Sequence, residues 1–348
     1  MSALNIGVIG CGYWGPNLLR NFAENEGAQL RWICDLDEER LASMARRYPM
    51  ARTTTDYRAL VSDPDTDAVA VVTPVATHYP IARELLRAGK HVLLEKPFTA
   101  TVAEAEELIE LAEQHKRTLM VDHTFIYTGA VRKMKELVNS GELGDLLYFD
   151  SVRINLGLFQ RDINVLWDLA PHDLSIMDYL IERRPQAVSA LGSSHIERGI
   201  ENIAYLVMLF EEEFIAHFHF NWLAPVKIRR TMIAGSSKMV LYDDIEPTEK
   251  VRVYDSGVTA NRVGDREADY QTLVSYRTGD VWAPKLDSTE ALRYVVAEFL
   301  ESIRAGRRPL TDGQAGLRVV QLLEAAQKSM KYGGQAIILS EPGCIARA

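Results

Sequence analysis

Lys96 is one of three side chains in this sequence that together could carry out acid–base chemistry. It lies in the triplet Glu95-Lys96-Pro97, at the end of a short apolar run that predicts a strand. A lysine in this place could hold a substrate hydroxyl and stabilise the negative charge that develops on its oxygen. The alternative is a solvated lysine that caps the end of a strand. We also expect the Lys96–Pro97 peptide bond to be cis, as sharp turns at active sites often contain such a bond.

The other two side chains are Asp168 and His172, which lie four residues apart in the segment DINVLWDLAPHDLSIMDYL. If a helix has begun by Asp168, both side chains lie on one face and can touch. A histidine with a carboxylate partner is a standard general acid–base pair, because imidazole titrates near neutral pH. Two alternatives stay open. Asp168 could be only the N-cap of the helix, with Pro171 in its first turn, and His172 could be a histidine of the core.

A glycine-rich turn near the N-terminus indicates dinucleotide binding. Gly10, Gly12 and Gly15 spell GxGxxG, directly after a predicted strand and before a predicted helix. The first glycine permits the tight turn, the second allows a pyrophosphate to approach the backbone, and the third allows the helix to pack against the strand. Tyr13 and Trp14, which complete the turn, belong to the same candidate cofactor site.

Asp35 favours NAD as the cofactor. It follows Gly15 by 20 residues, at the end of the second predicted strand, where a carboxylate can accept both ribose hydroxyls of an adenosine. The same carboxylate would repel the 2′-phosphate of NADP, and the next residue is Leu36 rather than arginine or serine. Arg40, about one helical turn further on, keeps NADP as the less favoured alternative.

The elements that must position these residues divide the chain into two domains near residue 123. The first part alternates short apolar runs with helical patterns, which predicts a parallel sheet covered by helices. From residue 186 to about 253 the pattern changes to long antiparallel strands joined by polar turns. We therefore predict domains over residues 1–122 and 123–348. The predicted strands of the first domain are 4–9, 29–35, 68–72, 90–95 and 118–122.

Composition limits the classes of function. A chain of 348 residues suits two domains. With 48 acidic and 39 basic residues the formal charge is −9, which argues against nucleic-acid binding. The three cysteines, Cys11, Cys34 and Cys344, fit neither a disulfide framework nor a metal site, so we expect a reducing cytoplasm. No signal peptide or membrane-spanning run is evident, and we expect no membrane association.

Together these motifs resemble the Gfo/Idh/MocA family of sugar and inositol dehydrogenases. The resemblance rests on GCGYWG, the strand ending in EKP, the VVTP of residues 71–74 with Thr77-His78 after it, the D-x-x-x-H pair and the late helix GLRVVQLLEAAQKSM. It extends over essentially the whole chain. It implies an α/β fold: an N-terminal doubly wound Rossmann domain, and a C-terminal α+β domain with a large, mostly antiparallel sheet. It also implies NAD(P) as cofactor and a sugar, inositol or nucleotide sugar as substrate.

The resemblance also implies roles for individual residues. By position, Lys96, Asp168 and His172 match the family's catalytic residues, with Lys96 and His172 also touching the substrate. The residues that match positions near the nicotinamide are Thr73, Pro74, His78, Glu95 and Lys96. Many relatives carry an arginine in the segment after the sixth strand, where this chain has Tyr127, which is the candidate for contact with the substrate at that place. Further candidates for contact with a polyol or phosphate are Arg153, Asn155, Arg161 and Asn164, which could equally be solvated strand and loop residues.

The segment DINVLWDLAPHD is similar to that of family members that act on nucleotide-activated sugars, such as UDP-N-acetylglucosamine 3-dehydrogenases. We therefore expect metal-free hydride transfer at the 3-position of a UDP-sugar: His172 takes the hydroxyl proton, Lys96 stabilises the oxygen and Asp168 orients the imidazole. The alternatives are an inositol or free-sugar dehydrogenase, a dehydrogenase of a non-sugar substrate, and a non-catalytic NAD-binding regulator.

His217 and His219 alternate with Phe218 and Phe220 along one predicted strand. No third ligand for a metal is evident, so we expect packing on a sheet face rather than a metal site. Because bulky residues occupy both faces of this strand, we predict subunit pairing through the sheet, in a homodimer or homotetramer.

Overall fold

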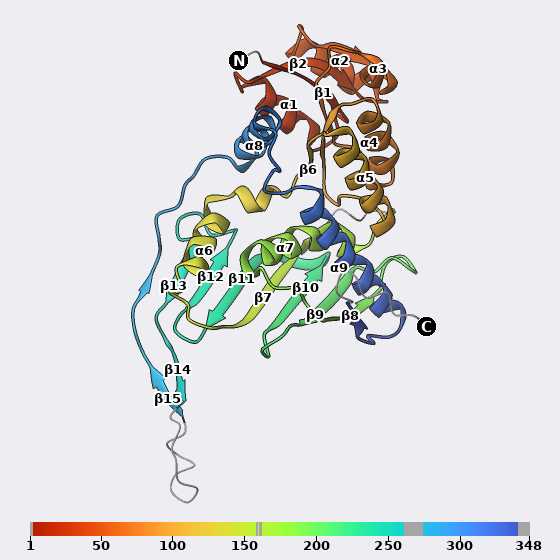
Figure 1. Cartoon of the computed structure of the whole chain (residues 1–348). Helices are drawn as coiled ribbons and strands as arrows, with labels where there is room; N and C mark the ends of the chain where they lie inside the picture. Colours follow the sequence, from red (N-terminus) through yellow and green to blue (C-terminus); the bar gives the residue numbers. More distant parts are fainter. Residues whose placement is uncertain (1–2, 158, 160–161, 261–273, 340–348) are drawn as a thin grey trace, which may run out of the picture. The chain divides into compact units, whose positions relative to one another are not determined.

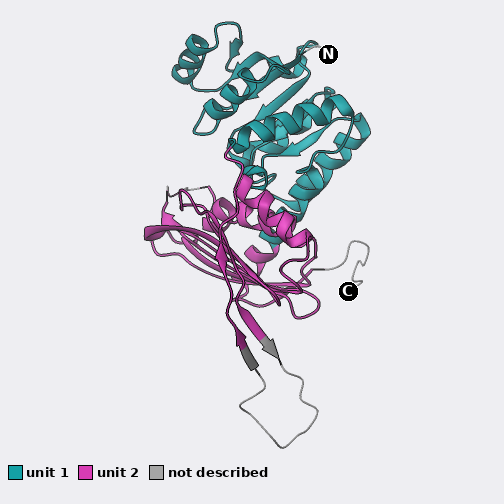
Figure 2. Ribbon diagram, turned by 90° about the vertical axis from the view of Figure 1, so that its left-hand side faces the viewer, with its two compact units in different colours: residues 1–128, 289–324 teal, residues 129–288, 325–348 magenta. Residues whose placement is uncertain are grey.

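The computed structural model describes residues 3–157, 159, 162–260 and 274–339, which fall into two compact units. The first unit comprises residues 1–128 and 289–324, and the second comprises 129–288 and 325–348 (Figure 2). The sequence predicts a single boundary near residue 123, whereas in the structure a C-terminal segment, residues 289–324, also belongs to the first unit. The periodicity of an amphipathic helix shows its apolar face but not which core that face covers. The sequence therefore does not show that the C-terminal segment belongs to the first unit. The functions assigned to the two domains stay predictions.

The sheet of the first unit is parallel throughout, with strand order β3-β2-β1-β4-β5-β6. Every residue of β4 is fully buried, as expected of a strand covered on both faces. The order reverses between β1 and β4, which is the doubly wound arrangement that the sequence predicted. The strands are β1 Leu4–Ile9, β2 Ala28–Cys34, β3 Arg52–Thr54, β4 Ala68–Val71, β5 His91–Leu94 and β6 Leu119–Val121.

Helices cover this sheet, and several carry sequence signals for their ends. Thr101 and Glu104 form a capping box at the start of α5, and Asp37 caps α2 through its side chain. The helices within residues 1–128 are α1 Gly15–Ala23, α2 Glu38–Arg47, α3 Arg58–Ser62, α4 His78–Arg87 and α5 Val102–His115, with the 3-10 turns η1 Val75–Thr77 and η2 Thr124–Tyr127. The C-terminal segment adds α8 Ala291–Ala305 and the first part of α9 Gly313–Lys331.

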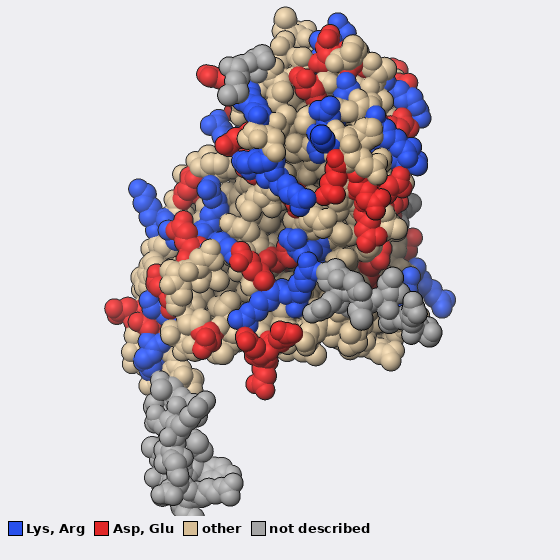
Figure 3. Space-filling model, viewed as in Figure 1, with Lys and Arg blue, Asp and Glu red and all other residues tan. Residues whose placement is uncertain are grey.

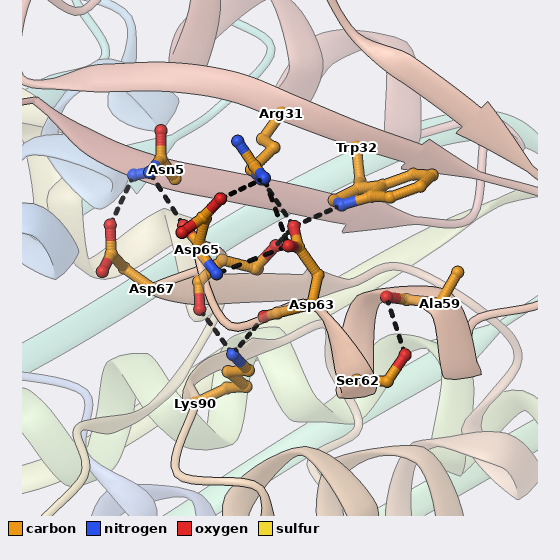
Figure 4. Close-up of polar contacts among 10 residues, drawn as sticks. Asn5, Arg31, Trp32, Ala59, Ser62, Asp63, Asp65, Asp67 and Lys90 are labelled. Atoms are coloured by element: carbon orange, nitrogen blue, oxygen red, sulfur yellow. Dashed lines mark hydrogen bonds and ion pairs between the residues drawn. The ribbon is translucent and has the colours of Figure 1, made fainter.

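Asp63 is the centre of a polar network that fixes the segment between α3 and β4 (Figure 4). Its carboxylate accepts hydrogen bonds from Arg31 at 2.5 Å, Trp32 at 2.7 Å and Thr66 at 2.8 Å. The Arg31 guanidinium holds the pKa of this carboxyl well below its ordinary range. Lys90 extends the network by donating to the carbonyls of Asp63 and Thr66, at 2.6 and 2.8 Å. The start of β5 is thereby tied to the start of β4.

The second unit is built on a mixed sheet with the order β16-β13-β12-β11-β7-β10-β9-β8-β17. Only β10 and β7 pair in parallel among the ladders of this sheet in the described part of the chain, so the predicted mostly antiparallel sheet is confirmed. Its strands are β7 Leu146–Leu156, β8 Ala187–Ser193, β9 Ile203–Leu209, β10 Ile215–Asn221, β11 Leu223–Gly235, β12 Met239–Asp243, β13 Val251–Tyr254, β16 Val281–Trp282 and β17 Ile337–Ile338. The strands β14 Gly257–Ala260 and β15 Val274–Arg277 form a separate pair.

Helices α6 Gly129–Asn139 and α7 Val165–Ile181 lie on one face of this sheet (Figure 1). The strand β10 shows how the two faces differ: Phe218 and Phe220 are fully buried on the helix side, whereas His217 and His219 are half-buried on the other. This confirms the predicted alternation.

Acidic and basic side chains intermingle over the face of the molecule drawn in Figure 3, rather than forming separate patches. Among the helices of the described residues, none is long and apolar enough to cross a bilayer.

Candidate active site

The glycine turn has the geometry that dinucleotide binding requires. Gly10 has a φ of 101°, and a Cβ there would lie 2.3 Å from the carbonyl oxygen of Val72. A Cβ at Gly15 would lie 2.1 Å from the carbonyl oxygen of Gly10, so only glycine lets α1 approach β1 this closely. A Cβ at Gly12 would meet only the tip of Arg40, at 3.9 Å. The backbone at the second glycine therefore faces open space, as the approach of a pyrophosphate demands.

Three further features of this turn fit NAD. No described side chain caps α1, so the helix N-terminus keeps backbone N–H groups for an anion. Tyr13 and Trp14 are 81% and 44% exposed. The two oxygens of Asp35 accept from the backbone N–H groups of Cys11 and Asp37, at 2.5 and 2.8 Å. This carboxylate is thus fixed beside the glycine turn, with lone pairs left for hydroxyl donors.

The Glu95-Lys96-Pro97 loop follows β5 directly, at the carboxyl edge of the parallel sheet. The Lys96–Pro97 peptide bond is cis, as predicted. His78, which is fully buried, holds this loop: its Nδ1 lies 2.9 Å from the carbonyl oxygen of Pro97, and its Nε2 lies 2.7 Å from that of Thr73. Burial lowers the pKa of His78, and the two carbonyl contacts partly offset this. The histidine therefore links the end of β4 to the loop that carries Lys96, and its predicted contact with cofactor stays a prediction.

Asp122 and His123 were not selected from the sequence, yet they lie next to this loop. They follow β6 directly, and β6 pairs with β5 in register. Asp122 is 2% exposed and His123 is 1% exposed. The Asp122 Oδ1 accepts from the Thr124 hydroxyl at 2.5 Å, whereas Oδ2 and both ring nitrogens of His123 have no hydrogen-bond partner among the described residues. The signal that could have identified them is a pair of polar residues directly after β6, the strand next to β5, which leads into Lys96.

In the second unit, Asp168 and His172 are both residues of α7 and lie one turn apart. The helix begins at Val165, and the side chain of Asn164 caps it by accepting from the N–H of Trp167 at 3.1 Å. The alternative that Asp168 is only the N-cap is therefore wrong. The predicted common face for the acid and the histidine is confirmed.

Two contacts within the second unit fix this pair. The indole N–H of Trp222, a fully buried residue, donates to Oδ2 of Asp168 at 3.1 Å. Asp173, the neighbour of His172, forms a bidentate ion pair with Arg153, with distances of 2.6 and 3.0 Å. Both partners have side chains only 3% exposed, so this pair binds α7 to β7. Arg153, a sequence candidate for contact with the substrate, thus forms a structural ion pair that the sequence did not predict.

The other substrate candidates lie in different surroundings. Tyr127 is buried, and its hydroxyl lies 3.1 Å from the hydroxyl of Thr311. The amide of Asn164 donates to Glu201 and Gln327, both at 2.7 Å. Asn155 donates to the carbonyl of Leu156 at 3.0 Å, and Arg161 lies outside the described residues. Contact of these residues with substrate stays a prediction. Within the described chain, no group of three histidine, cysteine or acidic side chains is arranged to hold a metal.

Comparison with known families identifies the chain. Residues 4–123 match the oxidoreductase family with an NAD-binding Rossmann fold, and residues 131–241 match the Gfo/Idh/MocA C-terminal domain. The chain belongs to the Gfo/Idh/MocA family, as the sequence motifs indicated. It is an oxidoreductase with an NAD-binding Rossmann domain.

Two relatives and one solved structure illustrate the range of the family. UDP-N-acetylglucosamine 3-dehydrogenase of Acidithiobacillus ferrooxidans is 27% identical, over 92% of this chain and 95% of its own length. The crystal structure of a protein of that name from the same organism has a TM-score of 0.79 at 26% identity, covering 95% of this chain and 99% of that one. Myo-inositol 2-dehydrogenase of Thermotoga maritima is 24% identical, over 94% of this chain and 96% of its own length.

Proposed function

We propose that this protein transfers hydride between NAD and a ring carbon of a nucleotide sugar, namely the 3-position of a UDP-sugar. The observation that carries the proposal is that each of the two units holds part of the required set of functional groups. Lys96 follows β5 at the carboxyl edge of the NAD-binding sheet, and Asp168 and His172 share one turn of α7. Lysine, acid and histidine are all present, which favours an enzyme over a regulator that only binds the dinucleotide.

Each candidate functional residue then has a defined role in the reaction. The glycine turn and Asp35 hold the dinucleotide, which supplies the hydride acceptor when it is bound. His172 takes the proton of the sugar hydroxyl at its imidazole, and Asp168 orients that ring and stabilises its protonated form. Lys96 donates to the same oxygen and stabilises its negative charge. Because the same groups can return a proton, they serve reduction of a keto sugar equally well.

The choice of substrate class rests on the segment before the histidine and on the relatives. The segment DINVLWDLAPHD is similar to the corresponding segment of enzymes that act on nucleotide-activated sugars. A UDP-N-acetylglucosamine 3-dehydrogenase also aligns with nearly the whole chain. Myo-inositol is the alternative, since a myo-inositol 2-dehydrogenase aligns over a similar length.

A substrate panel followed at the NADH absorbance band tests this function. UDP-N-acetylglucosamine, other UDP-sugars, myo-inositol and free aldoses are offered separately with NAD and with NADP. We expect a UDP-sugar with NAD to give the highest kcat/KM, by at least about tenfold. A higher kcat/KM for myo-inositol or a free sugar would reassign the substrate. Tight NAD binding without turnover of any compound would favour the regulator.

We also propose that the helix-free face of the large sheet pairs two subunits. Apolar side chains gather there, including Tyr205 at 46%, Leu209 at 48% and Ile215 at 41% exposure, and Tyr205 stacks on His219 at 4.4 Å. Contiguous exposed apolar surface of this kind marks an interface. Light scattering at micromolar concentration should give the mass of two or four subunits, and Tyr205→Asp should lower it. Met50→Asp, at an exposed residue of the first unit, is the control. A monomeric wild-type protein would disprove the pairing.

The reducing cytoplasm is the proposed location. Cys11 and Cys34 are both free and buried, and burial raises the pKa of each thiol to about 12. Such thiols are unreactive and suit a compartment without disulfide formation.

A further inference from the structure

Glu95 and Asp122 occupy the same row of the parallel sheet. Leu94 and Val121 are register partners at the ends of β5 and β6, and the N–H of Asp122 donates to the carbonyl of Leu94 at 2.7 Å. Each acid is the first residue after its strand. Register partners on adjacent parallel strands project to the same face, about 4.8 Å apart. The two carboxyl groups are therefore neighbours at the carboxyl edge of the sheet.

Few charges face this pair. Lys96 is the cation whose charge favours the ionised form of both carboxyls. From α9, Arg318 acts on His123, and burial together with these two cations lowers the pKa of His123 to about 3, so the ring is neutral. On the β4 side, Val72 follows the register partner of Leu94 and brings no charge. One ammonium group thus faces two carboxyl groups.

The surroundings disfavour ionisation of both acids. Asp122 is 2% exposed, and its Oδ2 has no hydrogen-bond donor among the described residues. The Oε2 of Glu95 accepts from the backbone N–H of Lys96 at 2.8 Å. Burial raises the pKa of both carboxyls, and the charge of Asp122 raises that of Glu95 further. Two like charges this close, one of them on a fully buried side chain, disfavour each other strongly unless further compensation is present.

We propose that Glu95 and Asp122 hold a single proton between them near neutral pH, and that the one negative charge they retain positions the Lys96 ammonium. The inference rests on the proposed function for the role of Lys96, but not for the shared proton. Asp122 is then a positioning residue, which acts on the substrate only through Lys96. With one charge on the pair, the ammonium is oriented yet remains able to donate to the substrate oxygen.

Infrared spectroscopy of the carboxyl C=O stretch tests the shared proton without any turnover. Wild-type minus Asp122→Asn and wild-type minus Glu95→Gln difference spectra should each contain one protonated carboxyl at pH 7 that ionises above neutral pH. In Asp122→Asn the remaining acid should ionise at lower pH, by about one unit or more, because its charged neighbour is gone. Asp67→Asn is the matched control, since Asp67 lies at the opposite end of the sheet, where its Oδ2 accepts from the N–H of Asn5 at 2.8 Å.

The positioning role has its own readout. In Asp122→Asn, the ionisation seen in the pH profile of kcat should move to lower pH by the same shift, whereas NADH affinity measured by fluorescence should stay within about twofold. Absence of a protonated carboxyl at pH 7 in both difference spectra would overturn the shared proton. A kcat profile identical to wild type would overturn the positioning role. If no sugar is turned over, the proposed function fails while the infrared result still decides the shared proton.

Discussion

Replacing Lys96 by methionine is expected to lower kcat by about 10²- to 10³-fold while NAD affinity stays within about threefold. Methionine keeps the length and the apolar stem of lysine but has no charge and no donor. The substrate oxygen then loses the cation that would stabilise its negative charge in the transition state. The glycine turn and Asp35, which hold the dinucleotide, lie at other strands of the sheet and keep their contacts. Turnover should therefore fall far more than binding.

Stopped-flow or steady-state NADH absorbance gives kcat, and NADH fluorescence gives the dissociation constant. The matched control is Lys116→Met, an exposed lysine just after α5 that has no task in the proposed reaction. A Lys96→Met enzyme that keeps wild-type kcat would remove this lysine from the chemistry. An equal loss of NAD binding would assign it to the cofactor alone.

His172→Ala should lower kcat by about 10²- to 10⁴-fold, since this is the range supplied by a positioned general base. The acid limb of the pH profile that reports imidazole ionisation should disappear with it. Added imidazole should restore part of the activity, because a small base can enter the space left by the side chain. NADH assays from acid to alkaline pH, with and without imidazole, measure both effects.

The control for this variant is His115→Ala, at an exposed histidine in the last turn of α5. It should behave as wild type in rate and in pH dependence. If His172→Ala raises KM and leaves kcat unchanged, the histidine contributes binding only, and the base must be another group.

Local pattern was sufficient for five of the six parallel strands of the first unit, whereas the short edge strand β3 Arg52–Thr54 was not predicted. The run AVAVV predicted β4 because a strand covered on both faces is continuously apolar, and the four residues of β4 are all fully buried. The glycine turn could be located because glycine is required at separate positions for separate steric reasons. Gly10 has a positive φ, and a Cβ at Gly15 would clash with the carbonyl oxygen of Gly10. Which unit α8 packs against could not be predicted, because a helical periodicity does not indicate which core the apolar face covers.

Contacts of the candidate site could be predicted where the residues are close in sequence, but not where strand register or packing brings distant residues together. Asp168 and His172 follow from a helical spacing of four. Asp122 becomes a neighbour of Glu95 only because β6 pairs with β5, and Trp222 reaches Asp168 across 54 residues. Arg153 was a candidate for contact with the substrate, and the sequence does not reveal that its guanidinium forms a buried ion pair with Asp173, 20 residues away. Long-range pairing of this kind requires the fold first.

The divided first unit has a consequence for synthesis on the ribosome. Its residues 1–128 emerge early, but the helix α8, which contacts α1, belongs to a segment that begins only at residue 289. Val295, Val296 and Phe299 of this helix are fully buried, so the core that they complete stays unfilled until then. At roughly 5–20 residues per second, translation of the intervening segment takes on the order of ten to thirty seconds. During that interval the nascent dinucleotide-binding half exposes apolar surface and offers a binding site for chaperones.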